Sequence, residues 1–88
     1  GKPRAQALST PFTHVVVTFK APPQPFAAVL QRQESDDAPW QTISRGVSGS
    51  SRLVDANPPQ NRSSRYRLVW QTENGSEGNP SEPVEVRW

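Results

Sequence analysis

The chain lacks the residue types on which several common classes of site depend. It has no cysteine, which excludes disulfide bonds and cysteine-based zinc or iron–sulfur sites. Its single histidine, His14, leaves little for acid–base chemistry or a histidine-rich metal site. No apolar run approaches the roughly 20 residues of a membrane helix, and no segment has the pattern of a signal peptide. We therefore expect no catalysis, no cofactor and no membrane insertion by this segment.

What the sequence does contain fits one small folded domain. Its 88 residues are 32% hydrophobic and 20% charged, with three Trp, three Phe and one Tyr to build a core. The net charge is only +2, and the arginines are spread from Arg4 to Arg87 rather than gathered in one patch. We therefore expect a mixed-charge surface and no nucleic-acid partner. We interpret residues 1–88 as a single domain taken from a larger multidomain protein.

Short strands are the secondary structure that the sequence predicts. Ten prolines interrupt the chain, and no stretch between them shows the i, i+3, i+4 apolar spacing of a helix. Apolar and polar residues instead alternate over short segments between turn-forming residues, as in an all-β sandwich. The predicted strands are residues 13–19, 26–33, 40–44, 52–56, 65–72 and 82–88, with residues 1–10 as an edge strand or a linker.

Alternation along these strands also predicts which side chains face the core. Burying one large apolar side chain contributes about 1.5–3 kcal/mol, so a dozen of them can offset the ordering of a small domain. The expected core residues are Val15, Val17, Phe19, either Phe26 or Val29, Leu30, Ile43, Leu53, Tyr66, Leu68, Trp70, Val84 and Val86.

The C-terminal half resembles a fibronectin type III domain. Residues 66–75 (YRLVWQTENG) and 78–84 (GNPSEPV) are similar to that family's strand F, the glycine-containing loop after it and the Pro-Ser-x-Pro-Val segment leading into strand G. Residues 40–43 (WQTI), and Phe19 followed by Pro22, are similar to features of strands C′ and B. The resemblance implies an immunoglobulin-like, seven-stranded β-sandwich in which strands C, F and G share a sheet.

The resemblance also implies a tyrosine corner, in which the hydroxyl of Tyr66 bonds the backbone a few residues upstream. Two features depart from the family. Trp70 stands where a valine is usual, and the connection at residues 57–64 is longer than usual. The Arg-Gly-Asp adhesion tripeptide of some family members is absent from the loop at 73–81, so integrin binding by that motif is not expected.

Two further patterns in the loops have a plain and a functional interpretation. Glu34, Asp36 and Asp37 could hold Ca²⁺, but they lack the spacing of a calcium loop, so we expect a solvated acidic turn. The triplets that begin at Asn61 and Asn74 fit N-glycosylation acceptors in exposed loops. Glycan on either asparagine would exclude a cytosolic location.

Aromatic and charged side chains supply the candidates for partner binding. Trp40 and Trp88 could anchor a partner or stack on sugars, or instead cover the edge of the core and a domain boundary. The arginines are predicted to form a stripe on outer sheet faces, unless they pair with Glu34 and Glu85. The loops at 21–25 and 73–81 are candidates because loops carry most specific contacts. The candidate residues are Trp40, Arg32, Arg65, Arg67, Arg87, Glu73, Asn74 and Glu77.

These features predict a non-catalytic extracellular module, as in a receptor, an adhesion protein or the ectodomain of a membrane protein. Such a module would bind a protein partner and space neighbouring domains, with glycan as a further candidate ligand. Two alternatives stay open: a carbohydrate-associated accessory module of a secreted polysaccharide-degrading enzyme, and an intracellular scaffold module. An exposed Trp40 coplanar with a second aromatic would favour the first alternative, and a buried Trp40 would count against it.

Overall fold

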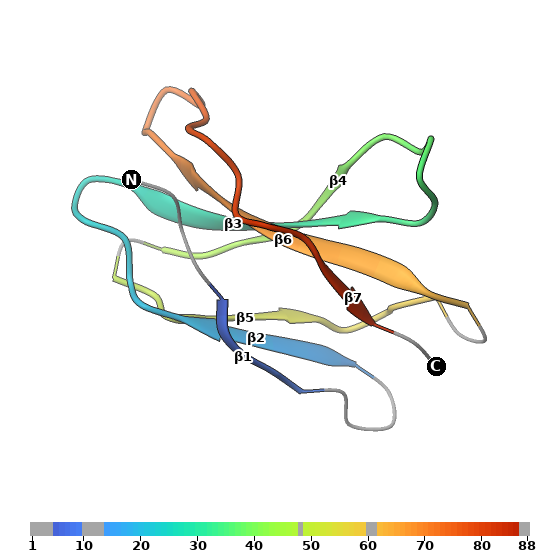
Figure 1. Cartoon of the computed structure of the whole chain (residues 1–88). Helices are drawn as coiled ribbons and strands as arrows, with labels where there is room; N and C mark the ends of the chain where they lie inside the picture. The colour runs from blue at the N-terminus through green and yellow to red at the C-terminus, as the bar shows by residue number, and fades with distance from the viewer. Residues whose placement is uncertain (1–4, 10–13, 48, 60–61, 87–88) are drawn as a thin grey trace.

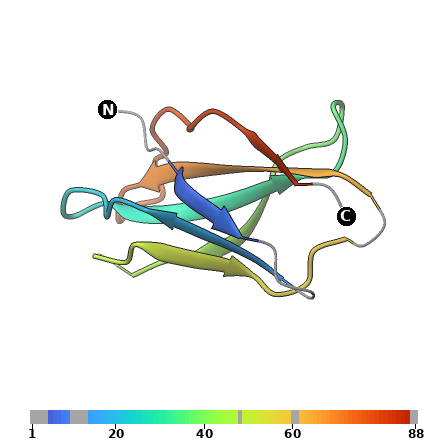
Figure 2. The ribbon, with the colours of Figure 1, turned by 60° about the horizontal axis from the view of Figure 1, so that its bottom comes forward.

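Two antiparallel sheets, stacked face to face, make up the described part of the chain (Figures 1 and 2). The computed structural model describes residues 5–9, 14–47, 49–59 and 62–86. One sheet has the order β1-β2-β5, formed by β1 (Ala5–Ser9), β2 (Val15–Phe19) and β5 (Arg52–Asp55). The other has the order β4-β3-β6-β7, formed by β4 (Gln41–Arg45), β3 (Ala27–Gln33), β6 (Ser64–Gln71) and β7 (Val84–Val86). The predicted all-β, immunoglobulin-like sandwich of seven strands is confirmed.

Most strands lie within a residue or two of their predicted bounds, and the exceptions have physical reasons. The N-terminal segment contributes β1, which pairs with β2 at the edge of its sheet. The last strand begins two residues later than predicted, at Val84, because Pro83 directly before it has no N–H to give to the ladder. Residues 87–88, with Arg87 and Trp88, lie outside the described residues, as do residues 1–4 and 10–13.

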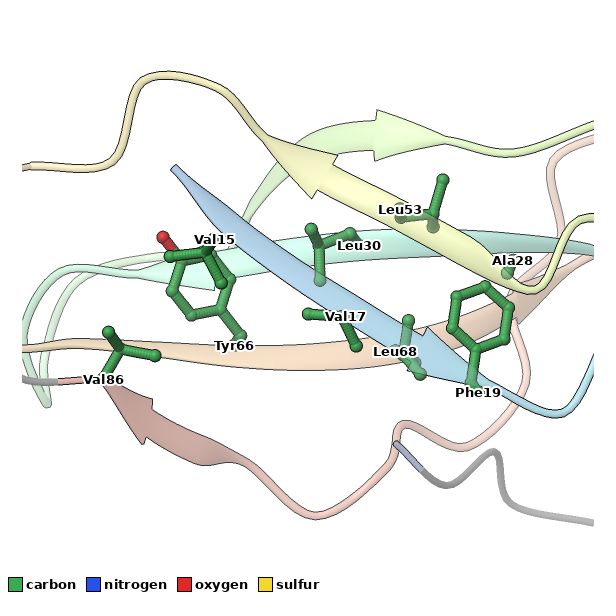
Figure 3. Close-up of a cluster of buried hydrophobic side chains, with 9 residues drawn as sticks. All are labelled: Val15, Val17, Phe19, Ala28, Leu30, Leu53, Tyr66, Leu68 and Val86. Atoms are coloured by element: carbon green, nitrogen blue, oxygen red, sulfur yellow. The ribbon is translucent and has the colours of Figure 1, made fainter. Parts of the chain in front are cut away.

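The core lies between the sheets, where alternate residues of β2, β3 and β6 meet (Figure 3). Trp70 is only partly buried but packs against this cluster, with its ring centroid 6.1 Å from that of Phe19 and the two planes tilted by 51°. The buried cluster consists of Val15, Val17, Phe19, Ala28, Leu30, Leu53, Tyr66, Leu68 and Val86.

Three residues of the expected core lie elsewhere. Ile43 is half-buried and Val84 is 36% exposed, because β4 and β7 are the edge strands of their sheet and only one neighbouring strand covers them. Val29 is fully buried, but it alternates with Ala28 and Leu30 and therefore faces the other side of β3. Phe26, the other alternative at this place, is half-buried, and the core cluster contains Ala28 instead of either residue.

A buried carboxylate joins the two sheets at one end of the core. Asp55, the last residue of β5, is 2% exposed. Its Oδ2 atom accepts 2.7 Å hydrogen bonds from the Tyr66 hydroxyl of β6 and from Nη1 of Arg32 on β3. Its Oδ1 atom accepts a 3.1 Å bond from the backbone N–H of Asn57. Both carboxylate oxygens therefore have donors, and the carboxylate of β5 in one sheet is held by two side chains of the other sheet and by the backbone just after β5.

This arrangement corrects two expectations. The Tyr66 hydroxyl donates to a side chain eleven residues upstream rather than to nearby backbone, because β5 ends with its carboxylate directly in front of the ring. Arg32 was expected on the outer face, but it shares the parity of Ala28 and Leu30 and points between the sheets, where its side chain is 13% exposed. The prediction that Arg32 joins an outer arginine stripe is therefore wrong.

The cluster also fixes the protonation states of its members. Burial, followed by the hydrogen bond and negative charge of Asp55, raises the pKa of Tyr66 well above its ordinary value of 10.0, and Arg32 opposes this shift. Burial on its own would lower the pKa of Arg32, but the hydrogen bond and charge of Asp55 outweigh it, so the pKa is raised. Tyr66 is therefore neutral and Arg32 charged wherever the domain is folded at ordinary pH.

We expect Asp55→Ala to lower the free energy of unfolding by about 3–5 kcal/mol, because it leaves the buried guanidinium of Arg32 unpaired. Chemical denaturation monitored by Trp fluorescence measures this loss. Asp37→Ala, in the exposed turn after β3, is the matched control and should change stability by less than about 0.5 kcal/mol. Equal effects of the two substitutions would contradict the role given to Asp55.

Alkaline titration tests the same cluster. Because the pKa of Tyr66 is higher in the folded than in the unfolded state, its contribution to stability is complete below pH 10 and is lost as the pH rises further, by up to about 1.4 kcal/mol per pH unit. Tyr66 is the only tyrosine, so tyrosinate absorbance reports on it alone. We expect that absorbance to appear only together with the loss of the β-sheet circular dichroism. Ionisation near pH 10 in a still-folded domain would refute this.

Candidate functional site

The outer face of the β4-β3-β6-β7 sheet is buried along its centre, although no second sheet covers it. In β3, every residue except Arg32 is buried, so both faces of the strand are shielded from water. Ala27 and Val29 on β3, with Val69 beside them on β6, form an apolar strip on this outer face. Two arginines of the flanking strands lie on this face, one of them opposite Val29 and the other opposite Gln31.

The first arginine, Arg45, crosses the strip from β4. It stands opposite Val29 in the register, and its Nε atom donates a 2.7 Å hydrogen bond to Oε1 of Gln71 on β6. Because β3 lies between β4 and β6, the aliphatic stem of Arg45 runs over β3 to reach that partner.

The second arginine, Arg67, crosses β3 in the opposite direction, from β6 towards the start of β4. Its Nε atom donates a 2.7 Å bond to Oε1 of Gln31, and its guanidinium carbon lies 4.3 Å from the centre of the Trp40 ring. This distance is within the range of a cation–π contact. Burial lowers the pKa of Arg67, and the negative charge of Glu77 opposes this shift. The guanidinium is held by the hydrogen bond to Gln31 and by its contact with the Trp40 ring.

The loop between β6 and β7 is fastened to the same face. Glu77 forms an isolated bridge with Gln71, and its Oε2 atom lies 3.4 Å from Nε2 of Gln31 and 3.5 Å from Nε2 of Gln71. Further along, the backbone N–H of Ser81 donates a 2.8 Å hydrogen bond to the carbonyl oxygen of Leu68. The Ser81 hydroxyl accepts a 2.8 Å hydrogen bond from the backbone N–H of Leu68. Glu77, a predicted candidate, therefore belongs to the network on the sheet face. We call Arg45, Arg67, Trp40, Gln31, Gln71 and Glu77 the outer-face network.

The tip of this loop is a separate feature at the end of the sandwich. Glu73 and Asn74 are exposed, and the side-chain oxygen of Asn74 accepts a 3.3 Å bond from the N–H of Ser76. Gly75 has a φ of +90°, which favours glycine in this turn. An open hollow lined by Pro25, Thr72, Glu73, Asn74 and Ser76 shows that the predicted loops at 21–25 and 73–81 meet here.

The remaining predicted residues are dispersed. Arg65 lies on the outer face but pairs with Asp36 of the β3–β4 turn, and Arg62 lies 3.9 Å from Glu34. Asn61 and Arg87 lie outside the described residues. Within the residues that the structure describes, no three His, Cys, Asp or Glu side chains gather in a way that could hold a metal ion. His14 lies directly before β2 and is half-buried.

The aromatic residues do not form the arrangement that would favour sugar stacking. Trp40 is half-buried, and Arg67 occupies one face of its ring. Phe19 and Tyr66 are buried in the core, and Trp70 packs on it. Among the described residues, the outer-face network therefore presents one aromatic ring and not a coplanar pair.

Sequence reasoning missed Arg45, Gln31 and Gln71. Arg45 was assigned to a loose connection after the fourth predicted strand, and the glutamines carry no distinctive motif. The signal that could have found them is parity: Gln31 falls on the same face as Val29, and Gln71 on the same face as Val69 and Arg67.

Comparison with known proteins identifies the fold. No sequence-family model matches the chain, and no curated protein matches it by sequence. A fibronectin type III domain of human fibronectin type III domain containing protein 3 has a TM-score of 0.76 at 16% identity, over 98% of this chain and 83% of that one. An Fn3-like protein from Clostridium thermocellum has a TM-score of 0.76 at 17% identity, over 97% and 88%.

Part of a larger enzyme is equally similar. Pectate lyase PelI from Erwinia chrysanthemi matches with a TM-score of 0.77 at 13% identity, over 98% of this chain and 28% of the enzyme. The chain therefore has the fold of a fibronectin type III domain, as its strands predicted. The described residues include no helix long and apolar enough to cross a membrane.

We expect Arg45→Ala to lower the free energy of unfolding by about 1 kcal/mol, because the arginine stem no longer covers Val29. Arg45→Met keeps an apolar stem and should stay within about 0.5 kcal/mol of the wild type. Urea denaturation of the two variants measures the difference. If both lose stability equally, the charge and hydrogen bond of Arg45, and not its stem, support the fold.

Proposed function

We propose that the chain is a non-catalytic, extracellular interaction module that binds a protein partner through the outer-face network and spaces neighbouring domains. The observation that carries this proposal is the Trp40–Arg67 pair, held on the open face of the sheet by Gln31. Trp and Arg are the side chains most enriched among energetically dominant interface residues. Fixing them before binding reduces the entropy that association costs.

The path of the chain supports the spacing role. The register places Ala5 beside Phe19 at the end of the sandwich where β2 finishes, and Val86 beside Ser64 at the opposite end. The strands therefore enter at one end of the long axis and leave at the other, as Figure 1 shows for β1 and β7. The longest extent of the domain is 37 Å, which is the distance such a module would add between its neighbours.

The non-catalytic part of the proposal rests on the shape and composition of the site. Catalytic sites are commonly enclosed clefts that exclude water, with a few convergent polar groups. The outer-face network lies on an open sheet face, and its ionisable members are two arginines and one glutamate. A binding surface needs no more than this.

A second candidate is an accessory module of a polysaccharide-degrading enzyme. The likeness to part of pectate lyase PelI, and to part of a β-1,2-glucanase from Parabacteroides distasonis at a TM-score of 0.65, favours it. The Arg67 guanidinium on the Trp40 ring counts against it, because the covered ring face is not free to stack on a sugar. We therefore place this candidate second.

Affinity capture distinguishes the two. The immobilised wild-type domain should bind a protein from the extracellular fraction of its source, saturably once that protein is purified, and Trp40→Ala combined with Arg67→Ala should weaken this binding at least about tenfold. Arg52→Ala, an exposed residue of β5 in the other sheet, is the control and should bind normally. Retention on polygalacturonate alone, lost in the double variant, would overturn the first proposal and support the second.

A further inference from the structure

We propose that the partner of the outer-face network is an acidic protein segment, whose carboxylates bind Arg67 and Arg45 beside the domain's own Glu77. This inference rests on the proposed function, because it takes the outer face as the binding surface. Three observations carry it: two arginines held in place by bonds to Nε, an internal carboxylate held by long hydrogen bonds, and an aromatic ring already occupied by a cation.

The Nη groups of both arginines are positioned to donate hydrogen bonds to carboxylates. In both Arg67 and Arg45 the hydrogen bond within the network uses Nε. No Nη atom of either residue bonds to another residue in the part of the chain that the structure describes, and Arg45 is exposed. The Nη groups of a guanidinium form a planar fork that matches a carboxylate. Because Gln31 and Gln71 already fix the two planes, little side-chain entropy is lost when a carboxylate binds.

Glu77 lies beside the two arginines, and its contacts are with the glutamines that hold them. Its Oε2 atom is 3.4 Å from Nε2 of Gln31 and 3.5 Å from Nε2 of Gln71, beyond the 2.7–3.2 Å of a good N–H···O bond. Its negative charge acts on Arg67 through space and raises the pKa of that residue against the effect of burial. Across the network, two positive side chains face this single negative one, so the surface keeps an excess of positive charge that favours an acidic partner.

The same geometry favours a protein over an acidic glycan. Sugar recognition by aromatic residues uses a free ring face, and Arg67 covers one face of Trp40. A peptide segment can bind by contacting the edge of the Trp40 ring and the stem of Arg67, while its carboxylates accept hydrogen bonds from the Nη atoms.

The test uses the full chain and a synthetic oligoglutamate peptide, with oligoglutamine as the uncharged comparison. Binding is followed by the backbone and indole N–H signals in NMR spectra, with the Trp40 signal assigned from Trp40→Phe. We expect oligoglutamate to shift Trp40, Arg67 and Glu77, more weakly at high salt, and oligoglutamine to shift none. Arg67→Gln should weaken binding about tenfold, whereas Arg52→Gln on the other sheet should not.

Glu77→Gln tests whether the negative charge of Glu77 opposes binding at the two arginines. Removing this charge should strengthen oligoglutamate binding about two- to fivefold. No change with Glu77→Gln, or equal weakening by Arg67→Gln and Arg52→Gln, would overturn the proposal, as would binding of polygalacturonate without oligoglutamate. If oligoglutamate fails to bind while capture of the protein partner still depends on Trp40 and Arg67, the acidic chemistry is wrong and the outer face remains the binding surface.

Discussion

The buried carboxylate of Asp55 is the constraint on which the rest of the structure depends. It is held by Arg32 of β3 and Tyr66 of β6, which face each other in the register of that sheet. The adjacent pair in the same register is Gln31 and Arg67, on the opposite face. Because side chains alternate along a strand, fixing the inner pair also fixes the outer pair. A slip of one residue would expose the core and take Arg67 away from Trp40.

Under the proposed function, one set of side chains on the outer face would serve both folding and recognition. The stem of Arg45 runs over β3, where Val29 is buried, while its charged end lies at the surface. A partner that moved this stem would expose apolar area and cover it again in the complex. The stability of the free domain and the affinity of the complex would then be coupled through the same few atoms.

Much of this fold could be read from alternation alone, and the error at Arg32 arose where alternation was set aside. Val15, Val17, Phe19, Leu68 and Tyr66 fall where their parity places them. Parity also places Arg32 beside Leu30, but the general tendency of charged residues to face water led to the opposite assignment. The error could not be recognised without Asp55, whose position as a partner depends on how two sheets are stacked. Local sequence does not encode that stacking.

The candidate site was partly predictable for the same reason. Trp40, Arg67 and Glu77 stood out as residue types suited to interfaces, and the structure brings these three together. Arg45 and Gln71 did not, because an arginine at a strand end and a glutamine within a strand are ordinary on any sheet surface. Their role follows only from a diagonal contact across β3, between strands that are distant in the sequence.

The proline at the start of β7 has a consequence for a protein that carries this domain next to others like it. Pro83 has no N–H to offer, so this end of the edge strand is poorly suited to pairing with the edge of another sheet. Adjacent copies are therefore less prone to pair edge to edge into continuous sheets during synthesis. A series of such domains could be held at high local concentration and still remain separately folded.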